Sequence, residues 1–157
     1  MHVPKSIALS LAFIAGASSS VGASCEHSQG VHGGDAFLAH LVGQWRAVGK
    51  IDERAVDANA SATWEGQALR LFLPTQGATV IHYDRQCDDF QAILDGSPGK
   101  GVERAGSVDI TFNQSSARRN DLVLTWDPKL RSWMVLLNRE RSRDQWQKYG
   151  ELKLTRS

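Results

Sequence analysis

The sequence predicts an all-β fold, a closed antiparallel up-and-down β-barrel of about 8–10 strands with a short N-terminal helix. Apolar and polar residues alternate with a period of two in short runs from Gly43 to Arg156. Turn-forming pairs such as Glu65-Gly66 and Asp127-Pro128 separate these runs at regular intervals, without helical interludes. An open sheet of this many strands would expose two edges, and closure into a barrel removes them.

Residues 1–23 have the features of a secretory signal peptide. Lys5 precedes an apolar run over 7–15 that is too short to span a bilayer, and small residues end the segment at Ala23. We therefore expect cleavage near Ala23 and export to the periplasm or the extracellular space. An uncleaved membrane anchor is the alternative, but no strong stop-transfer signal follows.

The remaining chain, about 134 residues, predicts a flexible polar tail over 24–35 and one domain over 36–157. The full chain has 18 basic and 17 acidic residues, and Lys5 lies in the signal, so the exported chain would carry 17 of each. This balance gives no electrostatic reason to expect nucleic acid or an anionic membrane as a partner. No further stretch has membrane-spanning length, and we expect a monomer or weak dimer.

Two cysteines, Cys25 and Cys87, predict a disulfide in an exported chain. Such a bond would tie the N-terminal segment to the barrel wall and stabilise the fold by ~2–4 kcal/mol. A lipid anchor on Cys25 is one alternative, although Gly22 stands where lipoprotein signals prefer a bulky apolar residue. Two free thiols are the other alternative.

The predicted helix is a short turn over 37–42, capped by Asp35 and ended by Gly43. A helix this short needs a docking surface, so we expect it to cover the barrel mouth as a lid. Nine strands are then expected, over 44–51, 56–65, 67–73, 78–84, 90–95, 106–112, 122–126, 133–137 and 146–156.

Several motifs along the predicted domain are similar to those of a bacterial lipocalin-like (calycin-type) β-barrel domain family of unknown function. They are Leu41-Val42-Gly43-Gln44-Trp45-Arg46, Thr63-Trp64-Glu65, His82-Tyr83-Asp84, Ile93-Leu94-Asp95-Gly96, Leu124-Thr125-Trp126-Asp127-Pro128, Trp133-Met134-Val135-Leu136-Leu137 and Leu152-Lys153-Leu154-Thr155-Arg156. The resemblance implies that Trp45, after Gly43, closes the narrow end of the barrel with Arg156 over its indole. These residues would then be structural, and the shorter loop over 95–99 departs from the family pattern.

The predicted ligand site depends on a row of small residues that would face the barrel interior. Such a row leaves space in a barrel that side chains otherwise fill, and with larger apolar neighbours it would line an apolar pocket. The candidate residues are Ala58, Ala60, Ala62, Trp64, Leu69, Leu71, Phe90 and Trp126. The alternative is a packed core in which Trp126 or Trp133 fills the same space.

These features predict a protein that binds a small apolar or amphipathic ligand without catalysis. His82 and Asp95 are the candidate acid–base groups of an alternative, isomerase-like or lyase-like enzyme, although the alternation points His82 outward. A barrel that binds proteins or inhibits them through its loops is a further alternative. The sequence has no catalytic motif, no metal-ligand spacing and no cofactor fingerprint, so no catalytic residue, metal or cofactor is predicted.

Overall fold

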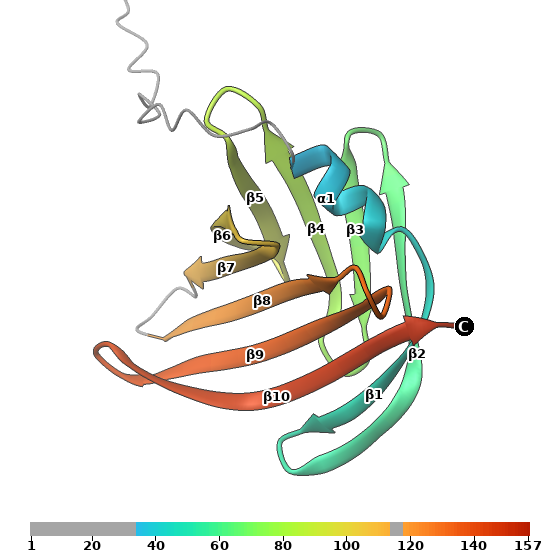
Figure 1. Cartoon of the computed structure of the whole chain (residues 1–157). Coiled ribbons are helices and arrows are strands. Elements are labelled where there is room, and N and C mark those ends of the chain that lie inside the picture. Colours follow the sequence, from blue (N-terminus) through green and yellow to red (C-terminus); the bar gives the residue numbers. More distant parts are fainter. Residues whose placement is uncertain (1–33, 114–117) are drawn as a thin grey trace, which may run out of the picture.

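The structure, a computed structural model, describes residues 34–113 and 118–157. Within these ranges one short helix precedes ten strands, and the strands form a single barrel (Figure 1). The helix is α1 (Gly34–Leu41). The strands are β1 (Gly43–Ile51), β2 (Arg54–Glu65), β3 (Ala68–Leu73), β4 (Gly77–Asp84), β5 (Asp89–Leu94), β6 (Ser97–Arg104), β7 (Ser107–Asn113), β8 (Arg119–Asp127), β9 (Ser132–Ser142) and β10 (Gln145–Arg156).

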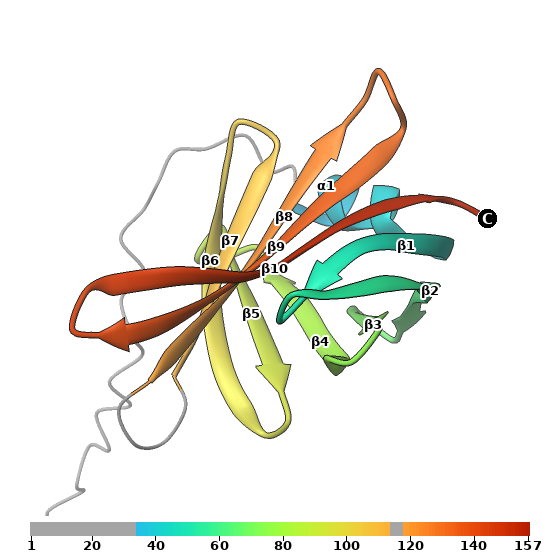
Figure 2. The same cartoon turned by 90° about the horizontal axis from the view of Figure 1, so that it is seen from below.

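The sheet closes on itself because β10 pairs with β1. Every strand pairs antiparallel with its neighbours in the sequence, and Trp45 opposite Arg156 begins the closing pair. Seen along the barrel in Figure 2, the strands splay around a common centre, as the right-handed twist of strands requires. The predicted closed up-and-down barrel with a short N-terminal helix is therefore confirmed.

The core occupies the inside of the barrel, where the alternation directs every second side chain. On β9, for example, Trp133, Val135 and Leu137 are buried while Met134 and Leu136 are partly exposed. The core continues into α1, whose buried face consists of Phe37, Leu38 and Leu41. The helix and the barrel thus share one hydrophobic core, which supplies the docking surface that so short a helix needs.

Two details of the prediction are wrong. The stretch from Ser97 to Arg104 is a strand, β6, whereas it was expected to be turn and loop. Pro98, Gly99 and Gly101 conceal it, because residues with little or no side chain erase the alternation. Asp35 lies inside the first turn of α1, and its carboxylate accepts from Arg85 instead of capping the helix.

Several predictions fall on residues outside the described ranges. The signal peptide, the segment up to residue 33 and Cys25 belong to this group. Within the part of the chain that the structure describes, no helix has the length and apolarity needed to cross a membrane.

Candidate functional site

One end of the barrel, the helix end, is filled by the apolar face of α1. The ring of Phe37 meets Trp133 edge-on at 5.0 Å between centroids and Phe90 at 6.0 Å. Both partners are fully buried, so the helix inserts its aromatic side chain into the barrel core. Such edge-to-face pairs stabilise a core by about 0.5–1.5 kcal/mol beyond the area they bury.

Side chains of three strands donate to the last two carbonyls of α1 and to that of Val42, the residue after the helix. Trp133 Nε1 donates to the oxygen of His40 at 3.3 Å, and Trp45 Nε1 donates to that of Leu41 at 2.6 Å. Arg156 donates to the oxygen of Val42 at 2.8 Å. The last carbonyls of a helix have no partner within it, so these donors fix the helix end against the barrel.

The guanidinium of Arg156 also lies over the indole of Trp45, at 4.1 Å from the ring centroid. Gly43 makes room for it, since a Cβ there would lie 2.0 Å from Nη1 of Arg156. The φ of +132° at Gly43 is likewise a conformation that glycine tolerates and other residues rarely adopt. These three residues form a latch that closes the helix end, which is a structural task.

The opposite end of the barrel carries polar cross-links. Tyr149 lies at the bulge of β10 and donates through its hydroxyl to Gln76 at 3.0 Å. Arg139 lies over the Tyr149 ring at 4.8 Å and donates to Asp52 at 2.7 Å. Burial raises the pKa of Tyr149, so its hydroxyl stays protonated and remains a donor at neutral pH.

The eight predicted ligand-binding residues do not surround one cavity. Five are fully buried in the packed interior, namely Ala60, Ala62, Leu69, Leu71 and Phe90. Ala58 is exposed, and Trp64 keeps 41% of its surface exposed. Trp126 is half-buried and stacks on His40 of α1, with the ring planes 12° apart. The set therefore divides between the core and the rim.

Neighbouring side chains explain why so many wall residues are small. Ala60 is the register partner of the buried Trp45, whose indole needs the space beside it. On β6, a Cβ at Gly99 would lie 2.6 Å from the Phe112 ring, and one at Gly101 would lie 2.9 Å from Ile110. The packed-core alternative thus describes these positions better than an alanine-lined pocket.

A cleft of about 600 Å³ opens at the helix end beside α1, and we call it the rim cleft. The turn from β2 to β3 and the turn from β4 to β5 form its walls. Its lining residues are Asp35, Trp64, Gly66, Gln67, His82, Tyr83, Asp84, Arg85 and Gln86. Gly66, with φ of +63°, reverses the chain two residues after Trp64, whose side chain lines the cleft.

Two charged groups of the rim cleft form an ion pair, and a third is hydrogen-bonded to neutral donors. Arg85 donates to the carboxylate of Asp35, with Nε at 2.9 Å. Asp84 accepts from the backbone N–H of Gln86 at 2.9 Å and from Cys87 and Gln91 at 3.3 Å, which shapes the turn. The ion pair neutralises Arg85 and Asp35, whereas Asp84 keeps its charge and uses its oxygens to shape the turn.

Tyr83 forms the inner wall of the rim cleft and donates its hydroxyl to Asp88. Burial and, to a smaller extent, that hydrogen bond raise the pKa of Tyr83 to about 12. The phenol is therefore neutral over the physiological range.

The two candidate acid–base residues lie at different ends of the molecule. His82 falls between the buried Ile81 and Tyr83 on β4, so it belongs to the outer face and is only half-buried. Asp95 is exposed in the turn between β5 and β6, at φ of +48°. Neither residue points into the barrel, so the geometry gives no support to an enzyme that uses them.

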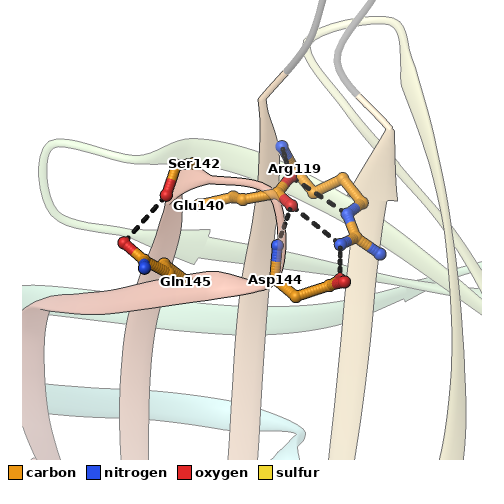
Figure 3. Close-up of polar contacts among 5 residues, drawn as sticks. All are labelled: Arg119, Glu140, Ser142, Asp144 and Gln145. Atoms are coloured by element: carbon orange, nitrogen blue, oxygen red, sulfur yellow. Dashed lines mark hydrogen bonds and ion pairs between the residues drawn. The ribbon is translucent and has the colours of Figure 1, made fainter.

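A second polar cluster lies on the outside of the barrel, where β8 begins beside the β9–β10 hairpin (Figure 3). Arg119 donates to both oxygens of Glu140, at 2.8 and 3.0 Å, and to Asp144 at 3.0 Å, while its guanidinium lies 5.3 Å from the Trp146 ring centroid. The hydrogen bonds from Arg119 and from the Asp144 N–H lower the pKa of Glu140 to about 2. Every member has a partner within the cluster, which therefore fastens the hairpin.

The β4–β5 turn also gathers possible metal ligands. Ligand atoms of Asp84, Cys87 and Asp89 lie within 4.8 Å of one another. Asp84 is already engaged in shaping the turn, and Asp89 pairs with Lys100 at 3.2 Å. The cluster gives no independent reason to infer a metal centre.

The sequence interpretation included Trp64 in the site but omitted most of the rim cleft. Gln67 was expected to begin the strand over 67–73, and Arg85 and Gln86 to lie in the turn after the strand over 78–84. Asp35 joins Arg85 from 50 positions away. Loops commonly carry binding residues, but nothing in one sequence indicates which loops meet.

Comparison with known proteins does not assign the chain to a family. No protein-family model matches the chain, and no curated protein matches it. The structure defines the class as a closed antiparallel ten-stranded β-barrel, which is consistent with a lipocalin-like barrel. The lipocalin-like family itself stays a prediction from the sequence motifs.

Proposed function

We propose that this protein is a non-catalytic binding barrel that holds a small amphipathic ligand in the rim cleft beside α1. The observation that carries the proposal is the half-exposed indole of Trp64 at the edge of a cleft of about 600 Å³ with polar walls. Pockets for small molecules commonly have this size and combine an apolar contact with a few convergent polar groups.

The packed interior supports a site at the rim in preference to one inside the barrel. The latch of Gly43, Trp45 and Arg156 and the inserted ring of Phe37 occupy the helix end of the core. A ligand in the core would have to displace α1 and the three side-chain donors at its carbonyls. The rim cleft is accessible without any such rearrangement.

A barrel that binds proteins through its surface also agrees with a packed interior. The rim cleft favours a small ligand because it is a hollow, whereas protein interfaces are typically broad.

The proposal can be tested by following the indole N–H signals of the five tryptophans in a proton–nitrogen correlation spectrum. Three probes of different chemistry are added separately: laurate, 1-anilinonaphthalene-8-sulfonate and maltohexaose. We expect at least one probe to shift the Trp64 signal while those of the buried Trp45 and Trp133 stay in place. Trp→Phe variants, one residue at a time, assign the signals.

Two results would contradict the proposal. If none of the probes moves the Trp64 signal at millimolar concentration, the rim cleft does not bind such ligands. If a probe shifts Trp45 and Trp133 but not Trp64, the ligand enters the barrel core.

Export and the disulfide form a separate part of the proposal. We propose that the chain is exported after cleavage near Ala23 and that Cys25 pairs with Cys87, which lies half-buried in the β4–β5 turn. The turn borders the rim cleft, so the bond would tie the N-terminal segment to one wall of the site. Intact-mass measurement of the exported protein before and after reduction tests this, since equal masses would refute the bond.

A further inference from the structure

We infer that the ligand of the rim cleft is an uncharged saccharide that extends beyond one ring. The inference rests on the proposed function and specifies the chemistry of its ligand. It comes from the side chains that the cleft leaves available and from the continuation of the cleft along the outer wall.

The groups left available in the rim cleft are neutral. Asp35 and Arg85 neutralise each other, and the carboxylate oxygens of Asp84 accept the hydrogen bonds that shape the turn. Among the described residues, the side chains of Gln67 and Gln86 take part in no hydrogen bond, and these carboxamides can both donate and accept. A hydroxyl group is also both donor and acceptor, so neutral hydroxyls match these groups better than an ion does.

Trp64 supplies the apolar surface that a saccharide ring requires. Its indole is 41% exposed at the edge of the cleft, within reach of the solvent. One face of a pyranose ring presents mainly C–H groups while its edges present hydroxyls, so a ring can lie on the indole and turn its hydroxyls toward the amides. An indole is well suited to such a contact because it is large, rigid and polar only at its N–H.

A long acyl chain fits the same cleft less well. Its walls offer the edge of Tyr83 and the indole of Trp64 as apolar surface, and the other lining side chains are polar. Burying an acyl chain against hydrogen-bonding groups would leave those groups without partners, at a cost in free energy.

A second hollow continues the rim cleft along the outside of the barrel. It has a volume of about 460 Å³ and shares His82 with the rim cleft. Its other lining residues are Val80, Gln91, Ala92, Ile93, Pro98, Gly99 and Lys100, from β4, β5 and β6. Ile93 supplies an exposed apolar surface there, and Gln91, whose Nε2 donates to Asp84, offers its Oε1 as a neutral acceptor. The shared His82 makes the two hollows consecutive, so an oligosaccharide fits them better than a single sugar.

A closed barrel disfavours an extended peptide in the same place. Peptides that add to a sheet use the free N–H and C=O groups of an edge strand. β4, β5 and β6 are paired on both sides, so they have no free edge to offer.

The test is titration of the full exported protein with maltohexaose, cellohexaose and chitohexaose by isothermal calorimetry and by the Trp64 indole signal. We expect at least one of them to bind, and Trp64→Ala to weaken that binding at least about tenfold. Trp64→Phe should weaken it less, because a smaller aromatic ring remains. Trp146→Ala is the matched control, since Trp146 is 39% exposed but lies outside both hollows on the distant β9–β10 hairpin.

A second variant separates one ring from several. His82→Ala should weaken a hexaose more than the corresponding monosaccharide, because His82 joins the two hollows. An equal loss for both would overturn the extended part of the inference.

The outcome also separates the inference from the proposed function. If laurate or 1-anilinonaphthalene-8-sulfonate shifts Trp64 and no hexaose does, the rim cleft is a binding site but not for saccharides. If no probe of any class shifts Trp64, the proposed function fails as well. Equal binding by Trp64→Ala and the wild-type protein would place the saccharide elsewhere and overturn the inference.

Discussion

Replacing Gly43 with alanine should loosen the latch at the helix end of the barrel. The new Cβ would lie 2.0 Å from Nη1 of Arg156, so the guanidinium must leave the Trp45 ring and the carbonyl of Val42. The clash is with the far end of a flexible side chain, so we expect the guanidinium to move and to weaken both contacts. The backbone meanwhile stays at φ of +132°, which alanine rarely adopts.

The magnitude follows from three contributions. Strain at this φ costs about 1–3 kcal/mol for a residue with a side chain. Loss of an exposed cation–π contact costs about 0.5–1 kcal/mol, and loss of the hydrogen bond from a charged donor costs about 1.5–3 kcal/mol. Arg156 is exposed, so water replaces part of the lost contacts and the lower values apply. The free energy of unfolding of Gly43→Ala should therefore fall by about 3 kcal/mol.

Urea unfolding followed by tryptophan fluorescence and far-ultraviolet circular dichroism measures this change. A slope of about 1–3 kcal/mol/M converts the loss into a fall of the midpoint by about 1–3 M. A double-mutant cycle with Arg156→Ala isolates the mechanism, because Gly43→Ala should cost only its backbone strain once Arg156 is gone. Gly66→Ala is the matched control, since Gly66 has φ of +63° but nothing within 4 Å of its Cβ position.

The refuting result is additivity. If Gly43→Ala costs the same with and without Arg156, within about 0.5 kcal/mol, the two residues are not coupled. Gly43 would then contribute only its conformational freedom, and not room for the Arg156 guanidinium. Coupling between Gly66→Ala and Arg156→Ala would equally show that the cycle reports general destabilisation.

Three further predictions concern the core and the outer cluster. Phe37→Ala should lower the free energy of unfolding by about 3–5 kcal/mol in urea titration, whereas an effect below 1 kcal/mol would mean that α1 is not part of the cooperative core. Gly99→Ala should lower the free energy of unfolding by about 1–3 kcal/mol, because its Cβ would lie 2.6 Å from the Phe112 ring. Adding Phe112→Leu to this variant should restore part of that loss. If it restores none, the clash with Phe112 is not the cause. The pKa of Glu140 is about 2 in the folded protein against an ordinary 4.5, so its stabilisation is complete above pH 4.5 and is lost as the pH falls toward 2. The urea midpoints of wild type and Glu140→Gln should therefore converge between pH 4.5 and 2, and a constant difference would show that Arg119 does not stabilise the ionised form.

The sequence predicted the barrel because its alternation is regular wherever side chains carry the pattern. The alternation did not predict β6, where Gly99 and Gly101 leave room for the larger side chains of Phe112 and Ile110 on β7. A strand whose inward positions are glycine leaves no apolar signal of its own. The glycines of β6 are explained only by the side chains of its partner strand, and the alternation in one sequence does not show which strands pair.

The alternation predicted which residues face the interior, but it could not predict which side chains lie beside them. Alternation correctly directed Ala60 and Ala62 inward, and both are buried. It could not indicate that the Trp45 indole occupies the space beside Ala60. Trp64 follows the same alternation but lies at the end of its strand, where the barrel wall ends and the cleft begins. Its surroundings therefore depend on the neighbouring turns, such as the β4–β5 turn, whose Arg85 pairs with Asp35.

The pairing of β1 with β10 has a consequence for the order in which the chain acquires its structure. The other strand pairs join neighbours in the sequence and can form as local hairpins, but Trp45 and Arg156 must meet from opposite ends of the domain. Until the final strand emerges during synthesis, β1 and β9 remain unpaired edges that invite aggregation. Closing so long a loop is slow compared with hairpin formation. A chain shortened before Gln145 would thus lose more than one strand, because it could never complete the ring.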